Sequence, residues 1–219
     1  MESPSGGTAG VLPYIRVKNE ALPRAKRGLS PGTQKALVLT EGERVHAGLA
    51  VGEDVVRCVT SLRSLPEEST NLTGSVFARY FVSNGAKCWL IRTDLAPSSR
   101  LQGYLDGVEP SLYDTATCRE RRDWWRFSMP QATPGVLIAQ AFKGATPKAL
   151  INDVAAHAVG GVAGVYNIDS VSASRFVAKL TSTDLHDRVV PYAKLMRKIE
   201  INQINSLLAD LSRDDLPNA

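Results

Sequence analysis

The sequence predicts an α+β fold: a curved, mainly antiparallel sheet that carries recognition loops, followed by a C-terminal helical segment. Short apolar runs separated by Gly, Pro and polar residues continue as far as Ile168, and this pattern is typical of strands and turns. After Asp169 the apolar residues recur at helical spacing instead. With 219 residues, 43% of them hydrophobic, the chain can bury a core as one large domain or two small ones.

Residues 1–86 are expected to supply the N-terminal strands and loops of the recognition region. Val11–Val17 and Lys35–Thr40 have the composition of short strands, and Pro13 favours an edge position for the first. Between them, Lys18–Thr33 is a loop rich in Pro, Gly and basic residues. This basic loop is either a solvated connector or a phosphate contact.

Residues 87–171 are expected to hold the sheet itself. Its centre is predicted to consist of four strands, Lys87–Thr93, Gly135–Phe142, Lys148–Asn152 and Val162–Ile168. One short helix is predicted between the first two strands, beginning after Ser98 as N-cap and ending at Gly107.

Residues 172–219 are expected to close the fold with two or three helices. Three segments show apolar residues at helical spacing: Ser172–Thr181, Leu185–Ile199 and Asn202–Leu211.

Composition narrows the function classes. The net charge of +4 and the pI near 9.0 permit a polyanionic partner without requiring one. Cys58, Cys88 and Cys118 are too far apart for a metal knuckle and too few for a disulfide framework, so we expect reduced thiols, a cytoplasmic protein and no metal site. No run approaches the roughly 18 apolar residues of a membrane span, and we expect no membrane partner.

The motifs of common enzymes are missing from the sequence. It contains no dinucleotide-binding glycine pattern after a strand, no phosphate loop, no His-Glu-x-x-His and no Gly-x-Ser-x-Gly. Gly160–Gly164 is the nearest glycine cluster, but its spacing is wrong for a dinucleotide turn. We therefore assign no catalytic residue, and the chain has the features of a binding module rather than a complete enzyme.

The segment Cys118–Arg126, called the Arg/Trp segment below, is the richest in side chains that could bind a ligand. Within nine residues it holds four arginines and two adjacent tryptophans: Arg119, Arg121, Arg122, Arg126, Trp124 and Trp125. Guanidinium groups bind phosphates and guanine edges through paired donors, and tryptophans supply rigid support or a stacking surface. Alternatively, the tryptophans belong to the core and the arginines are solvated or paired with Glu120 and Asp123.

In this order the motifs resemble the target-recognition region of gamma-type adenine-N6 DNA methyltransferases of restriction-modification systems. The matching motifs are Cys88-Trp-Leu-Ile-Arg92, Leu101-Gln-Gly-Tyr-Leu-Asp-Gly-Val-Glu109, Thr117-Cys-Arg-Glu-Arg-Arg-Asp-Trp-Trp125 and Pro147-Lys-Ala-Leu-Ile-Asn-Asp-Val-Ala-Ala156. The resemblance covers about residues 87–211 and rests mainly on the Arg/Trp segment. Trp125 stands where that family more often has tyrosine.

The resemblance implies recognition of a short double-stranded DNA site, so that a partner methyltransferase domain or subunit can methylate an adenine as a defence function. It implies no cofactor in this chain, because the S-adenosylmethionine loop and the Pro-Pro motif of the catalytic domain are missing. Whether the chain belongs to an enzyme therefore stays open, as do its target sequence and oligomeric state.

The same resemblance assigns the four arginines to phosphate or guanine contact. One tryptophan, with Trp124 favoured, is expected in the core and the other nearer the DNA. Lys143 and Lys148 are candidates for backbone contact, and Asn152 either reads adenine or caps the end of a strand. The alternative function is a structural or protein-interaction subunit of a defence complex, whose basic loops meet an acidic partner.

Overall fold

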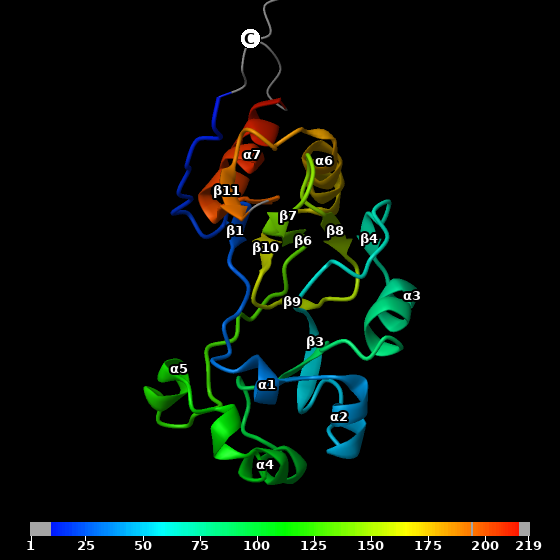
Figure 1. Cartoon of the computed structure of the whole chain (residues 1–219), viewed down its shortest axis with the longest axis vertical. Coiled ribbons are helices and arrows are strands. Elements are labelled where there is room, and N and C mark those ends of the chain that lie inside the picture. The colour runs from blue at the N-terminus through cyan, green and yellow to red at the C-terminus, as the bar shows by residue number, and fades with distance from the viewer. Residues whose placement is uncertain (1–9, 194, 215–219) are drawn as a thin grey trace, which may run out of the picture.

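The structure, a computed structural model, describes residues 10–193 and 195–214 and confirms the predicted α+β class. Two halves follow one another along the long axis of the molecule (Figure 1). The upper half contains a five-stranded and a three-stranded sheet with helices α6 and α7, and the lower half contains a four-stranded sheet with α1, α2, α4 and α5.

The five-stranded sheet organises the upper half. Its order is β1 (Arg24–Lys26), β10 (Val162–Tyr166), β6 (Val136–Ala139), β8 (Ala149–Asn152) and β4 (Asn71–Leu72). All neighbours pair antiparallel except β4 and β8, which are parallel. Three of the four predicted central strands thus lie side by side here.

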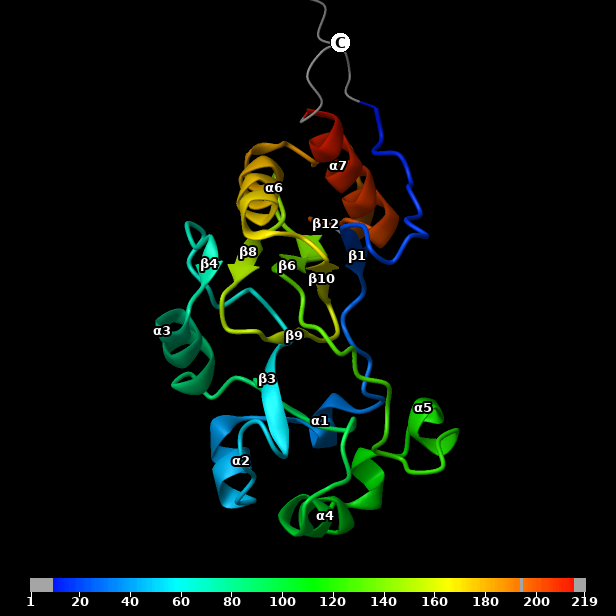
Figure 2. The same ribbon diagram turned by 180° about the vertical axis from the view of Figure 1, so that it is seen from behind.

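Alternation along β6 explains how this sheet joins the two halves. Successive side chains of a strand point to opposite faces. Val136 and Ile138 pack into a core cluster with α6 (Ser170–Ser182) and α7 (Ile201–Asp214), which cover that face (Figure 2). Leu137, between them, belongs to the larger cluster shared with the lower half. The larger cluster therefore contains side chains of both halves and holds them together.

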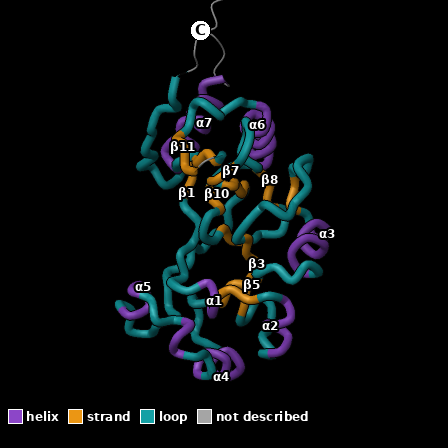
Figure 3. Tube along the Cα trace, in the orientation of Figure 1, coloured by secondary structure: helices purple, strands orange, loops and turns teal. Residues whose placement is uncertain are grey.

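The second sheet contradicts a predicted helix. Within 185–199, expected to be helical, the chain forms the strands β11 (Val190–Ala193) and β12 (Met196–Lys198) (Figure 3). β12 pairs with β11 on one side and with β7 (Ala141–Phe142) on the other. Pro191 has no N–H for a helix, and the tertiary pairing of β12 with β7 provides an alternative. The flanking predictions at 172–181 and 202–211 are confirmed by α6 and α7.

The lower half contains the remaining predicted strand. β5 (Trp89–Ile91) lies between β2 (Val38–Leu39) and β3 (Val55–Val59), and β3 pairs in parallel with β9 (His157–Ala158). The prediction that 87–93 shares a sheet with the other central strands is wrong. The predicted helix is confirmed as α4 (Ser99–Asp106), with Ser98 accepting from the Leu101 N–H at 3.1 Å and Gly107 as C-cap.

Short helices surround this sheet. They are α1 (Gln34–Leu37), α2 (Glu41–His46), α3 (Gly74–Phe77) with a π-helical turn at Ala78–Val82, a 3₁₀ turn at Pro110–Leu112 and α5 (Ala116–Arg119). The predicted strand Lys35–Thr40 is correct only at β2, because its first part belongs to α1.

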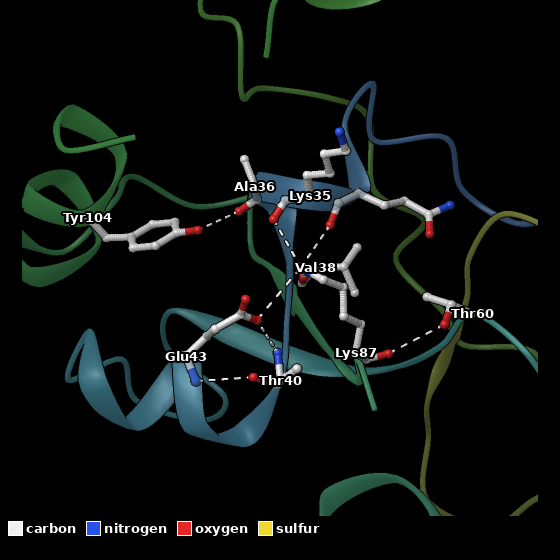
Figure 4. A network of polar contacts seen from close by, with 9 residues as sticks. Lys35, Ala36, Val38, Thr40, Glu43, Thr60, Lys87 and Tyr104 are labelled. Atoms are coloured by element: carbon white, nitrogen blue, oxygen red, sulfur yellow. Dashed lines mark hydrogen bonds and ion pairs between the residues drawn. The ribbon is translucent and has the colours of Figure 1, made fainter. Parts of the chain in front are cut away.

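Lys87 fixes the junction between α1 and β2 (Figure 4). Its ammonium group donates to the carbonyl oxygens of Val38 at 2.8 Å and Lys35 at 3.0 Å, and it lies 3.6 Å from a Glu43 carboxylate oxygen. These carbonyl oxygens lie where α1 ends and β2 begins directly, so the helix backbone offers them no N–H donor. The Lys87 ammonium group supplies the missing hydrogen-bond donors. Tyr104 from α4 adds a hydrogen bond to the Ala36 carbonyl at 2.7 Å.

The N-terminal segment is not the strand predicted for 11–17. It runs extended along the upper half beside α7 and β11 (Figure 1). The Leu12 N–H donates to the Arg188 carbonyl and the Ile15 N–H to the Asn202 carbonyl, and Leu12 is buried.

Candidate functional site

The Arg/Trp segment lies at the lower end of the molecule, in α5 and the turns after it (Figure 1). Thr115 caps α5 by accepting from the Cys118 N–H at 3.2 Å, and the Cys118 thiol is buried beneath the loop at Gly32. Gly32 has φ +96°, and a Cβ there would lie 2.8 Å from the Cys118 sulfur. The segment is therefore packed against the basic N-terminal loop.

The two tryptophans have different environments, as predicted, but their roles are reversed. Trp125 is 7% exposed and belongs to the larger core cluster. Trp124 is half-buried and stacks on Tyr113, with ring centroids 4.1 Å apart and planes 11° apart. The expectation that Trp124 is the core residue is wrong, because the turn after α5 directs the second aromatic inward.

Arg121 is a structural tether. Its guanidinium donates to the carbonyls of Pro31 and Ser30 on the N-terminal loop and to that of Trp124 in its own turn. The same group lies 5.7 Å from the ring centre of Phe127. The hydrogen-bond donors of Arg121 therefore hold two loops together.

Of the other arginines, two have acidic partners. Arg119 lies 3.5 Å from Asp114, and Arg126 lies 3.2 Å from Asp123 and over the ring of Trp125 at 4.6 Å. Arg122 is exposed and makes no ion pair with any residue that the structure describes. Cys118–Arg126 contains four arginines against Glu120 and Asp123, a net formal charge of +2, and Glu109 and Asp114 just before it bring the net formal charge of residues 109–126 to zero.

A pocket of about 400 Å³ opens beside these side chains. Its lining includes Arg119, Arg121, Arg122, Tyr113 and Trp124. An anionic or flat aromatic group could meet guanidinium donors and a ring surface here.

The remaining predicted contacts lie in the other half. Lys143 and Lys148 line a separate pocket of about 610 Å³ beside β7 and β8. The Lys148 ammonium group donates a hydrogen bond to the Leu65 carbonyl oxygen. The Asn152 side-chain amide donates to the carbonyl oxygens of Pro134 and Ala156 and accepts from the Ala156 N–H. Asn152 therefore caps the end of its strand, which was one of its two expected roles. The structure does not bring these three residues to the Arg/Trp segment.

Sequence reasoning missed a surface at the opposite end of the molecule. We call it the basic–apolar face and define it as the exposed side chains of residues 11–27 and 186–200. Six of the large apolar side chains that the structure shows as exposed lie on it: Val11, Tyr14, Leu22, Val190, Tyr192 and Leu195. Every residue of β11 is exposed, although it is an apolar edge strand. Because residues 185–199 were expected to form a helix, these side chains were not predicted to be exposed together.

A groove of about 630 Å³ lies on this face between the N-terminal segment and the start of α7. Its lining is Tyr14, Arg27, Val190, Glu200, Ile201 and Asn202. Both polar and apolar side chains thus line one depression.

The buried titratable groups are structural in character. Burial raises the pKa of the Cys58 thiol and raises that of Cys88 to about 12, which keeps both thiols protonated and unreactive. Burial likewise lowers the pKa of His157, whose Nδ1 has no hydrogen-bond partner. Over the described ranges, no three His, Cys, Asp or Glu side chains gather in a way that could hold a metal ion.

No protein-family model matches the chain, and comparison with curated proteins found no match. Among the helices that the structure describes, none is both long and apolar enough to cross a membrane.

Proposed function

We propose that the protein is an interaction subunit that binds a partner protein through the basic–apolar face. The observation that carries this proposal is β11, an apolar edge strand exposed along its whole length. Its Tyr192 is 62% exposed, and Leu195, which follows the strand, is 80% exposed. Contiguous exposed apolar side chains rimmed by polar ones mark protein contacts, and aromatic residues are enriched at their centres. A subunit of a defence complex is one setting for such a surface.

Photo-crosslinking in the cells that produce the protein tests this proposal. Benzoylphenylalanine replaces Tyr192, and the matched control replaces Leu95, which is 49% exposed between β5 and α4. We expect a discrete adduct with a second polypeptide at position 192 and none at 95. Equal adducts at both positions, or none at 192, would contradict the proposal.

We propose DNA recognition through the Arg/Trp segment as the second candidate function. The pocket that joins three arginines to the stacked Tyr113 and Trp124 supports it, with Arg122 free to contact phosphate. In this proposal a separate methyltransferase domain binds S-adenosylmethionine and transfers the methyl group. The curvature of the sheet that carries the recognition loops is part of the same proposal. The zero net charge of residues 109–126 is the reason for ranking it second.

Duplex binding measured by fluorescence anisotropy across a salt series tests the second candidate. Replacing Arg119 and Arg122 together by alanine should weaken binding and reduce the salt slope by about one unit per lost phosphate contact. Arg63→Ala is the control, because Arg63 is exposed beside the pocket of the upper half. An unchanged slope in the double variant would assign these arginines to the solvated surface.

A further inference from the structure

The basic–apolar face presents positive charge beside its exposed apolar side chains. The described residues of ranges 11–27 and 186–200 include eight Lys or Arg and three Asp or Glu. Four of these cations are exposed, Arg16, Lys18, Lys26 and Arg27, against two exposed carboxylates, Glu20 and Asp187. The face therefore offers a net positive surface to a negative partner.

The acidic groups of this face are already engaged. Glu20 lies 2.7 Å from Arg24, and Glu200 lies 2.9 Å from Lys198 and 3.6 Å from Arg27. An Asp187 carboxylate oxygen lies 2.9 Å from His186 Nδ1. That leaves three exposed cations that form no ion pair with a described carboxylate: Arg16, Lys18 and Lys26, of which Lys26 lies 5.2 Å from the ring centre of Tyr166. These cations are available to carboxylates from outside the molecule.

The geometry of β11 favours side-chain contact over strand addition. Pro191 occupies the middle of this four-residue edge strand and has no N–H to offer an added strand. Its neighbour Tyr192 lies 5.7 Å from the Lys198 ammonium, so an aromatic surface and a cation are presented together. The groove at Tyr14 and Val190 continues this arrangement toward Arg27.

Two other occupants fit less well. A second copy of the chain joined by a two-fold axis would bring identical basic surfaces together, which repel one another. Duplex DNA would satisfy the cations but leave Tyr192, Leu195 and Val190 against a polar, strongly hydrated surface.

From these observations we infer that the basic–apolar face docks an acidic protein segment whose carboxylates alternate with apolar side chains. The inference rests on the proposed interaction function and names the chemistry of its partner. Carboxylates meet Arg16, Lys18 and Lys26, while apolar side chains cover Tyr192 and Leu195 and enter the groove at Tyr14.

Peptide binding to the whole protein tests the inference. The probe is a fluorescein-labelled 16-residue peptide of alternating Glu and Leu, compared with the same peptide carrying Gln in place of Glu and with a 16-base-pair DNA duplex. We expect the Glu peptide to bind more tightly than either, and its binding to weaken with salt.

Two double variants locate the contact. Arg16→Glu with Lys18→Glu should weaken binding of the Glu peptide about ten-fold, and so should Tyr192→Ser with Leu195→Ser. Each has a matched control: Lys35→Glu with Arg100→Glu, both exposed in the lower half, for charge, and Leu95→Ser for apolar exposure. Both controls should bind as the unmodified protein does, and melting temperatures confirm that every variant is folded.

The outcomes separate the inference from the proposed function. Equal binding of the Glu and Gln peptides, or tighter binding of DNA that depends on Arg16 and Lys18, would overturn the inference, while an adduct at position 192 would still support the interaction function. Self-association by sedimentation that Tyr192→Ser abolishes would assign the face to a second copy and also overturn it. Loss of the adduct at position 192 would remove the basis of both.

Discussion

At the scale of single residues, adjacent side chains in the Arg/Trp segment perform unrelated tasks. Trp125 fills the core, Trp124 stacks on Tyr113, and Arg121 ties the turn to the carbonyls of residues 30 and 31. Among the four arginines of this segment, only Arg122 has no intramolecular partner in the described part of the chain. Residue type alone therefore gives a poor guide to which of these side chains could contact a ligand.

The tryptophan environments predict different costs of truncation. Trp125→Ala should lower the free energy of unfolding by about 3–5 kcal/mol, because it removes a large side chain from a packed cluster. Trp124→Ala should cost less, about 0.5–1.5 kcal/mol for the lost ring pair plus its partial burial. Urea denaturation of both variants measures the difference, with Arg122→Ala as a surface control. A larger loss for Trp124 would contradict the assignment.

At the scale of elements, Gly28 is the point where the N-terminal loop packs against the backbone between β9 and β10. Leu29 and Val159 form an isolated bridge there, and Gly28 lies against the backbone between residues 159 and 162. A Cβ on Gly28 would stand 2.3 Å from the Val162 carbonyl oxygen and 2.8 Å from the Val159 carbonyl carbon. Because these are backbone atoms, no side-chain rotation can relieve the contact.

Gly28→Ala should therefore destabilise the protein by at least about 1–3 kcal/mol, the usual cost of overpacking. Gly161→Ala is a matched control nearby, since a Cβ there meets nothing within 4 Å. Thermal unfolding followed by circular dichroism compares the two. Equal melting temperatures would show that the loop and strand can separate without cost.

At the scale of the whole molecule, β9 lies where the two halves meet, and its His157 is buried with an unpartnered Nδ1. Burial lowers the pKa of His157, with a further decrease from Arg92 that is opposed by Asp94. The folded protein therefore holds the imidazole neutral, while the unfolded chain takes up a proton below pH about 6.5. The contribution to stability is complete above that pH and decreases as the pH falls toward the lower pKa of the folded state.

This difference predicts that lowering the pH from 7.5 to 5.5 reduces the free energy of unfolding by up to about 1 kcal/mol more in the unmodified protein than in His157→Gln. The carboxyl groups whose pKa is lowered, Glu20, Glu41, Asp94 and Asp169, titrate below this window. Chemical denaturation at both pH values measures the effect. His46→Gln, at an exposed position, should keep the full pH dependence, and a parallel response of His157→Gln would contradict the prediction.

The sequence by itself determined the α+β class, four of the strands, helix α4 with its serine cap, and helices α6 and α7. These elements follow from local periodicity and capping, which act over a few residues. It also identified two tryptophans in different environments, because neighbouring side chains rarely share one.

Tertiary structure decided the rest. A segment with helical periodicity forms a hairpin, because β12 pairs with β7. The strand β5 lies in one sheet, and the strands β6, β8 and β10 lie in another. The same long-range contacts set Lys143, Lys148 and Asn152 apart from the arginines and gathered residues 11–27 and 186–200 into one face. Contacts between residues more than a hundred positions apart leave no periodic trace in a single sequence, so only the folded chain displays that face.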